Sequence, residues 1–186
     1  MAMEANERFD EARAIAIAAH GGQMYGDRPY AYHLQAVVDV LTRFGAGLED
    51  AATAPLLVAA WLHDSLEDTA LTFAEIEARF GAEVAELVWR VTDEPGATRE
   101  ERKPATYRKT RESAMAVVLK LADRIANVEA SLATDRRLLE MYRREHVEFK
   151  ATLHPAAGGE LAGRMWTCLD SLLAASGTRD APLAAS

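Results

Sequence analysis

Residues 54–68 read APLLVAAWLHDSLED. The first nine are apolar on every side, which is typical of a helix buried at the centre of a bundle. The stretch then turns polar and places His63, Asp64, Glu67 and Asp68 at the end of the most hydrophobic helix in the chain. Charges in such a place are costly unless they are paired or bound to a metal. We therefore expect a helix over about 54–68 that ends in a metal or catalytic site.

The rest of the chain also has a helical period. No convincing signal for a β-hairpin, such as alternating residues around Asn-Gly or Asp-Gly, is present. Loops are expected at 21–29 and at about 93–106, where Pro95, Gly96 and Pro104 break helices. The sequence predicts an all-α, single-domain bundle of about eight to ten helices over residues 1–177 and a frayed tail over 178–186. The expected helices are about 4–19, 30–44, 54–68, 73–80, 84–91, 113–132, 135–153 and 160–175.

The bulk properties narrow the functions that this chain can have. With 186 residues, 49% of them apolar, it can fill one core. The formal net charge of −8 argues against a general affinity for nucleic acid or for an anionic membrane. There is no signal-peptide pattern and no apolar run of about 18 residues, so the cytoplasm is the expected compartment. The composition leaves a homodimer open.

His33 and Asp123 are the candidates to complete a metal site with His63 and Asp64. They lie on two other expected helices, next to small or apolar neighbours. Two histidines and two aspartates form a mixed nitrogen and oxygen ligand set that suits Mn²⁺, with Zn²⁺ or Fe²⁺ as alternatives. A lone histidine on a helix is most often structural. The string His-Asp-x-x-Glu-Asp at the end of a buried helix favours the metal site.

Glu67 and Asp68 follow the metal candidates by about one helical turn. Carboxylates in that position can orient a water molecule bound at the metal or move its proton, so we predict that both are catalytic. The alternative is that they belong to a solvated helix end. Lys120, Asp123 and Asn127 share one helix face at i, i+3 and i+7, which is unusual for a buried helix, and we expect Lys120 and Asn127 to bind substrate. For Asn127 the alternative is a buried amide satisfied by the backbone. Asn127 can donate and accept hydrogen bonds at once, which fits a ribose or a base.

Residues 99–111 reverse the sign of the chain's charge. They hold six basic residues, among them Arg99 and Lys103, against two acidic ones, a local net charge of +4. Arginine and lysine both pair with phosphate oxygens, so this segment could bind the phosphates of a substrate. A solvated helix face is the alternative for any single residue in it.

Four segments resemble the hydrolase domain of the RelA/SpoT-type alarmone enzymes, and most closely the stand-alone small alarmone hydrolases. The HD and ED motifs of that family match Ala60–Thr69, and the helix with its last metal aspartate matches Leu119–Asn127. The first motif, which ends at a metal histidine, resembles Ala19–His33, and the spacing from Phe80 to Thr92 also agrees. The likeness covers about residues 8–153.

The resemblance implies an HD-domain helical bundle with hydrolase activity. Such an enzyme removes the 3′-pyrophosphate of guanosine tetra- or pentaphosphate, usually with Mn²⁺, and releases GDP or GTP plus pyrophosphate. The same matching puts Glu67 and Asp68 at the catalytic positions and Asn127 at the ribose. It puts Arg99 at the phosphates and Tyr142 at a substrate-contacting position.

The first motif departs from the family at Met24 and Tyr25. In the family, the glutamine at the position of Gln23 is usually followed by basic residues that contact the purine. Tyr25 could still stack on a base, because aromatic stacking tolerates either purine. Two alternatives therefore stay open: the same chemistry on another nucleotide, such as an adenosine alarmone or the 2′-phosphate of NADPH, or a non-catalytic nucleotide-binding regulator.

Overall fold

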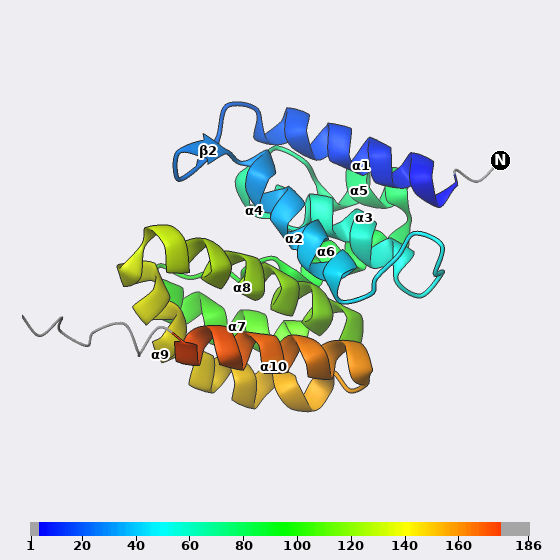
Figure 1. The fold of residues 1–186 in the computed structure, drawn as a ribbon. Helices are drawn as coiled ribbons and strands as arrows, with labels where there is room; N and C mark the ends of the chain where they lie inside the picture. The colour runs from blue at the N-terminus through cyan, green and yellow to red at the C-terminus, as the bar shows by residue number, and fades with distance from the viewer. Residues whose placement is uncertain (1–3, 176–186) are drawn as a thin grey trace, which may run out of the picture.

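The computed structural model describes residues 4–175. Within them the chain forms ten α-helices and a short two-stranded hairpin, so the predicted all-α fold is confirmed (Figure 1). The predicted tail, residues 178–186, lies outside the described part. Among residues 4–175, no helix combines the length and hydropathy needed to cross a membrane. The elements are α1 (Ala5–His20), β1 (Met24–Tyr25), β2 (Arg28–Pro29), α2 (Ala31–Arg43), α3 (Ala54–Leu62), α4 (Ser65–Asp68), α5 (Phe73–Phe80), α6 (Ala82–Val91), α7 (Arg99–Thr110), α8 (Ala114–Thr134), α9 (Arg136–Leu153), the 3₁₀ helix η1 (His154–Ala156) and α10 (Glu160–Ala175).

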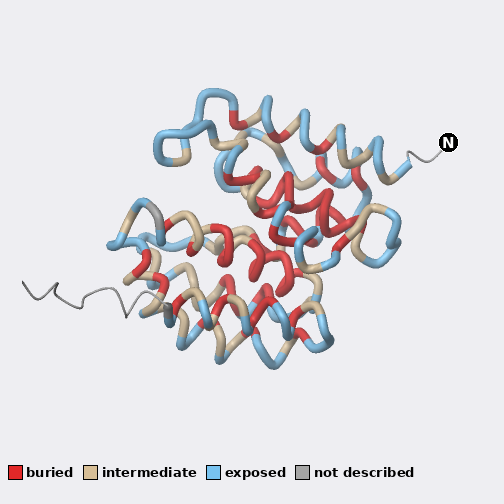
Figure 2. Tube along the Cα trace, viewed as in Figure 1, coloured by how far each residue is buried: buried red, intermediate tan, exposed pale blue. Residues whose placement is uncertain are grey.

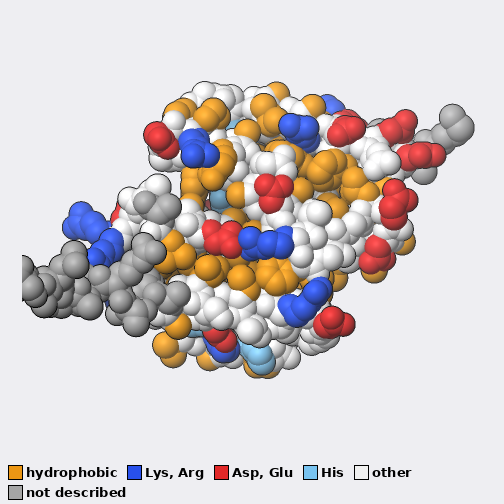
Figure 3. All heavy atoms as spheres, viewed as in Figure 1, with side chains coloured by type: hydrophobic (Ala, Val, Ile, Leu, Met, Phe, Trp, Pro, Cys, Tyr) orange, Lys and Arg blue, Asp and Glu red, His pale blue; other side chains and the backbone are white. Residues whose placement is uncertain are grey.

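The core forms around α3 and α8. All nine residues of α3 are buried, as the apolar run predicts, and this helix packs against α1, α2, α6 and α8. Helix α8 packs in turn against α2, α6, α9 and α10. The buried residues therefore run through the middle of the molecule, and the outer faces of α1, α9 and α10 are exposed (Figure 2). On the face shown in Figure 3, acidic and basic side chains are scattered among hydrophobic ones, without a large area of one charge.

The prediction of one helix over 54–68 was wrong at its centre. Helix α3 ends at Leu62, and α4 begins only at Ser65. The ring of His63 turns back onto the carbonyl of Ala60, with Nδ1 2.8 Å from that oxygen. His63 Nε2 lies 3.0 Å from Asp64 Oδ2.

The loop predicted over 93–106 is confirmed for residues 93–98, but the chain is helical from Arg99 onward, so the prediction was wrong for residues 99–106. Thr98 starts α7 with a capping box, in which its hydroxyl accepts from the Glu101 backbone N–H and the Glu101 carboxylate accepts from that of Thr98. Pro104 sits inside the helix. The segment stays helical because it is tied down by packing, since Tyr107 is 1% exposed.

The loop predicted over 21–29 contains a small antiparallel hairpin that the sequence interpretation missed. Tyr25 pairs with Arg28 across a two-residue turn, Gly26-Asp27. Gly26 has a φ of +62°, a conformation that glycine adopts without the strain of a side chain. Glycine followed by aspartate is itself a hairpin signal, so this turn was readable from the sequence.

Candidate functional site

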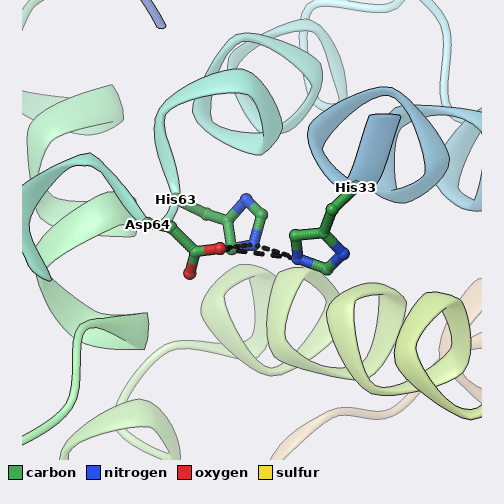
Figure 4. Close-up of side chains that lie close together, drawn as sticks. All are labelled: His33, His63 and Asp64. Atoms are coloured by element: carbon green, nitrogen blue, oxygen red, sulfur yellow. Dashed lines mark hydrogen bonds and ion pairs between the residues drawn. The ribbon is translucent and has the colours of Figure 1, made fainter. Parts of the chain in front are cut away.

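The four predicted metal ligands meet between three helices. His33 comes from α2, His63 and Asp64 come from the end of α3, and Asp123 comes from α8. His33 Nε2 lies 3.2 Å from His63 Nε2, 3.4 Å from Asp64 Oδ2 and 3.4 Å from Asp123 Oδ1. Figure 4 shows His33, His63 and Asp64 pointing toward one another above α8. Both histidines are buried, with exposed fractions of 3% and 1%.

The chemistry of these donor atoms fits a divalent cation. Ligand atoms bound about 2.1 Å from one ion lie roughly 3 to 3.5 Å from each other, close to the separations found here. The carbonyl of Ala60 accepts a hydrogen bond from Nδ1 of His63, so in a neutral ring Nε2 keeps its lone pair. That lone pair faces the oxygens of Asp64 and Asp123 at 3.0 and 3.9 Å. A cation would satisfy these converging acceptors together.

The pKa values of the four side chains show that the two aspartates make the electrostatic potential of this cluster negative. Burial alone would lower the pKa of His33, but the carboxylates of Asp123 and Asp64 outweigh it and raise that pKa to about 9. The pKa of His63 is raised in the same way, against its own burial, chiefly by Asp64. Burial would raise the pKa values of Asp64 and Asp123, but both are lowered, because the two histidines and, for Asp123, also Lys120 outweigh burial. Positive charge is therefore favoured at this point.

Glu67 and Asp68 stand beside the cluster on α4. Glu67 accepts a hydrogen bond from the backbone N–H of Asp93. Its pKa is raised by desolvation and by the charge of Asp93, while Lys120 opposes the shift. Asp68 Oδ2 lies 3.1 Å from the hydroxyl of Tyr30.

One cavity of about 170 Å³ joins the metal cluster to basic side chains. The cations Arg99, Lys103 and Lys120 line it together with Glu67 and Asp68. Every residue predicted to bind substrate borders this cavity, although those predictions came from four separate stretches of sequence. These residues are Tyr25, Arg99, Lys103, Lys120, Asn127 and Tyr142.

The cations around the cavity have hydrogen-bond partners within the chain, carboxylates for Arg99 and Lys103 and a backbone carbonyl for Lys120. Arg99 pairs with Glu145, with Nη2 3.1 Å from Oε2, and Lys103 Nζ lies 2.7 Å from both oxygens of Asp93. Lys120 Nζ donates to the carbonyl of Val91 over 2.9 Å. Of the six basic residues in the segment 99–111, only Arg99 and Lys103 border the cavity.

Several residues of the site were not identified from the sequence. Tyr30 donates to Asp64, and His20 packs flat on the ring of Tyr30 and contacts Gln23 through Nδ1. His20 is the last residue of α1, and its ring is buried beside the site. Arg124, next to Asp123, also borders the cavity and was missed. Tyr30 lies three residues before His33, and that spacing was the one signal that could have pointed to it.

A second, larger cavity of about 530 Å³ adjoins the first. It lies between the hairpin, α2 and α8, and it shares Tyr25 and His33 with the smaller cavity. Part of its wall is formed by Ala36, Ala126 and Ala130. The site thus combines a small charged chamber with a roomier and less polar one.

The comparisons with known proteins all point to the same family. The HD domain family matches residues 12–147. The human guanosine-3′,5′-bis(diphosphate) 3′-pyrophosphohydrolase MESH1 is 38% identical over 122 residues, which cover 63% of this chain and 66% of that protein. The Aquifex aeolicus guanosine-3′,5′-bis(diphosphate) 3′-pyrophosphohydrolase is 33% identical over 152 residues, 79% of this chain but 21% of that enzyme. The chain therefore spans about a fifth of one relative and about two thirds of the other.

A solved structure shares the fold. It belongs to a metazoan ortholog of SpoT that hydrolyzes ppGpp, and it aligns with a TM-score of 0.72 and 26% identity over 91% of this chain and 96% of its own. The HD-domain bundle expected from the sequence is thereby confirmed. The His33, His63 and Asp64 cluster is consistent with the metal dependence of this family. The chain belongs to the HD-domain family, within its group of RelA/SpoT-type hydrolases.

Proposed function

We propose that this protein is a metal-dependent hydrolase that removes the 3′-pyrophosphate of (p)ppGpp-type alarmones in the cytoplasm. The products are GDP or GTP and pyrophosphate. The observation that carries the proposal is the single cavity in which a metal-binding cluster faces lysine and arginine side chains. The names of the relatives, which are pyrophosphohydrolases of guanosine-3′,5′-bis(diphosphate), support the choice of substrate.

We assign the metal to His33, His63, Asp64 and Asp123. The mixed nitrogen and oxygen donors favour Mn²⁺, with Zn²⁺ or Fe²⁺ as weaker candidates. When bound, the ion supplies Lewis-acid chemistry, because it lowers the pKa of water and neutralises charge on a phosphate. These four side chains would hold the ion in place. They keep bulk water away from it, since both histidines are almost fully buried.

In the proposed reaction, the oxygen of a water molecule bonds to the phosphorus attached to the ribose 3′ oxygen. The bond from that phosphorus to the 3′ oxygen breaks, pyrophosphate departs, and the 3′ oxygen takes up a proton. Glu67 and Asp68 are the carboxylates that accept the proton of the water. The raised pKa of Glu67 makes it a stronger base than an ordinary carboxylate. Arg99, Lys103 and Lys120 hold the phosphates.

The nucleoside belongs in the larger cavity, next to the charged chamber. Asn127 and Tyr142 border the chamber, where they are available to the ribose. The alanine wall and Tyr25 offer apolar and aromatic contact to a base. Such contacts do not by themselves distinguish guanine from adenine. This wall favours, as a second candidate, the same chemistry on an adenosine alarmone or on the 2′-phosphate of NADPH.

The test is hydrolysis by protein stripped of metal with a chelator and reloaded with Mn²⁺. Guanosine tetraphosphate, its adenosine counterpart and NADPH are offered in parallel, and the products are separated by ion-exchange chromatography. We expect equal amounts of GDP and pyrophosphate from guanosine tetraphosphate, with no activity in the stripped protein. Mn²⁺ should also raise the melting temperature, because a ligand that binds only the folded state stabilises it.

Matched variants separate the site from the rest of the fold. His33→Ala and Glu67→Gln should lose activity, and His33→Ala should also lose the Mn²⁺-dependent rise in melting temperature. His154→Ala is the control, because His154 is an exposed histidine in η1, outside the cavity. If the reloaded protein binds these nucleotides without releasing pyrophosphate or phosphate, it is a non-catalytic regulator and the proposal is wrong.

A further inference from the structure

We propose that Tyr25 is a positioning residue that holds two ligands of the metal centre in place. The inference rests on the proposed metal role of His33 and Asp123. Two contacts carry the argument, one made by the ring and one by the hydroxyl.

The ring of Tyr25 packs flat on the imidazole of His33. The ring centroids are 4.8 Å apart, and the planes are inclined by 13°. His33 is 3% exposed, so Tyr25 provides one of the surfaces that fix the plane of its ring. That plane determines where Nε2 points, and Nε2 is the atom that faces His63 and both aspartates.

The hydroxyl of Tyr25 reaches Asp123 through Asn127. Tyr25 donates to Oδ1 of Asn127 over 2.8 Å, and Nδ2 of Asn127 donates to Oδ1 of Asp123 over 2.5 Å and to its carbonyl over 3.0 Å. An amide has one acceptor end and one donor end. The hydroxyl on the acceptor end therefore keeps the donor end turned toward the carboxylate.

Tyr25 also lies on the boundary between the two cavities and borders both. It belongs to β1, so its backbone is held by the hairpin while its side chain reaches from α2 to α8. A ligand that fills the larger cavity touches the residue that aligns His33 and Asp123. Through Tyr25, a ligand bound in the larger cavity would therefore affect the positions of His33 and Asp123.

The test is the affinity of the metal-free protein for Mn²⁺ alone, measured by calorimetry and by the electron paramagnetic resonance signal of free Mn²⁺. Tyr25→Phe keeps the ring and removes the hydroxyl. We expect it to bind Mn²⁺ up to about tenfold more weakly, because Asn127, the hydrogen-bond partner of Asp123, loses the hydroxyl that orients its amide. Tyr25→Leu removes both contacts and should bind more weakly still. The hydrolysis defect of Tyr25→Phe should shrink as Mn²⁺ is raised.

A double-mutant cycle with Asn127→Ala tests whether the hydroxyl of Tyr25 acts on Asp123 through Asn127. If the hydroxyl acts through Asn127, the double variant should bind Mn²⁺ no more weakly than Asn127→Ala alone. Tyr32→Phe is the matched control, because Tyr32 borders the larger cavity but is 44% exposed and lies under the guanidinium of Arg28. It should bind Mn²⁺ like the wild type.

Two results would overturn the inference while the proposed function stands. One is a wild type that binds Mn²⁺ and releases pyrophosphate, with Tyr25→Phe and Tyr25→Leu binding Mn²⁺ equally well. The other is a cycle in which the effects of Tyr25→Phe and Asn127→Ala add in full. A wild type that binds no Mn²⁺ would overturn both the proposed function and this inference. The helical circular dichroism of each variant should match that of the wild type.

Discussion

Tyr30 donates its hydroxyl hydrogen to Oδ2 of Asp64 over 2.7 Å. The same hydroxyl oxygen lies 3.1 Å from Oδ2 of Asp68, so it stands between a proposed metal ligand and a proposed catalytic carboxylate. His20 packs on the Tyr30 ring with the centroids 4.4 Å apart, and Gln23 donates to the backbone carbonyl of Asp68 over 2.6 Å. Residues from the end of α1 to the start of α2 thus contact Asp64 and Asp68, on either side of the start of α4.

Tyr30→Phe should weaken Mn²⁺ binding by about tenfold, because Asp64 loses the donor that orients its carboxylate. The turnover number should fall as well, since Asp68 loses the same neighbour. Calorimetry with Mn²⁺ and steady-state hydrolysis of guanosine tetraphosphate measure the two effects. An unchanged Mn²⁺ affinity together with an unchanged turnover number would show that the backbone alone places these carboxylates.

The residues proposed as metal ligands and catalytic carboxylates could be singled out from the sequence because their signal is local. His63, Asp64, Glu67 and Asp68 stand out as polar groups at the end of an apolar run, and Asp123 interrupts another. Packing brings those runs together, since buried helices of one small domain share one core. The meeting of these residues in one site is therefore a consequence of the hydrophobic pattern.

The partners of these residues were missed because they are defined by contacts between distant segments. Nothing near Tyr30 in the sequence indicates Asp64, 34 positions later, and the pairing of Arg99 with Glu145 spans 46 positions. The helix α7 was missed for a different reason. Pro104 is a strong local breaker, but the cap at Thr98 and the burial of Tyr107 outweigh it.

Lys103 should make substrate binding depend on pH. Its pKa is lowered to about 8, first by burial and then by the charge of Lys120, while Asp93 opposes the shift. Lys103 is therefore charged below about pH 8 and loses its charge above it. We expect the KM for guanosine tetraphosphate to rise as the pH increases through about 8, because the neutral amine no longer attracts phosphate.

Lys103→Arg tests whether the loss of charge on Lys103 causes the pH dependence of KM, since a guanidinium stays charged throughout this pH range. Its KM should stay nearly constant between about pH 7 and pH 9, whatever its absolute value. Steady-state kinetics at saturating Mn²⁺ provide the comparison. A rise in KM that is as steep in Lys103→Arg as in the wild type would assign the pH dependence to another group.

Glu145 should contribute stability that disappears in acid. Its carboxylate pairs with both Arg99 and Arg124, and these hydrogen bonds and charges lower its pKa in spite of burial. A carboxyl group with a lowered folded-state pKa stabilises the fold above its unfolded pKa, about 4.3. That contribution is lost as the pH falls through the lower folded-state value.

Glu145→Gln should therefore be less stable than the wild type at pH 7, by about 1.5 to 3 kcal/mol, the usual worth of hydrogen bonds to a charged group. The difference should shrink below about pH 4. Urea unfolding at a series of pH values measures it, and other carboxyl groups cancel in the comparison. A difference that persists unchanged at pH 3 would mean that packing, rather than charge, is lost in the variant.

Pro104→Ala should stabilise the protein. Pro104 has no N–H to donate to the carbonyl of Glu100 one turn earlier, and a proline inside a helix costs about 3 kcal/mol. Alanine restores that donor but gives the unfolded chain more freedom, which costs up to about 1 kcal/mol. The other ties of α7 remain, because the hydroxyl of Thr110 still donates to the carbonyl of Arg90 over 2.8 Å. A net gain of about 1 to 2 kcal/mol is expected.

Thermal and urea unfolding of Pro104→Ala measure this gain, and Pro95→Ala is its matched control. Pro95 is exposed in the loop between α6 and α7, so alanine there restores no helical hydrogen bond. Pro95→Ala should therefore be no more stable than the wild type, whereas Pro104→Ala should melt higher by several degrees, at about 2 to 4 °C per kcal/mol. Equal stability of the wild type and Pro104→Ala would show that α7 has already adjusted to the missing hydrogen bond. The helix would then owe its place beside the cavity to the cap at Thr98, the burial of Tyr107 and the side-chain bonds of Arg99, Lys103 and Thr110.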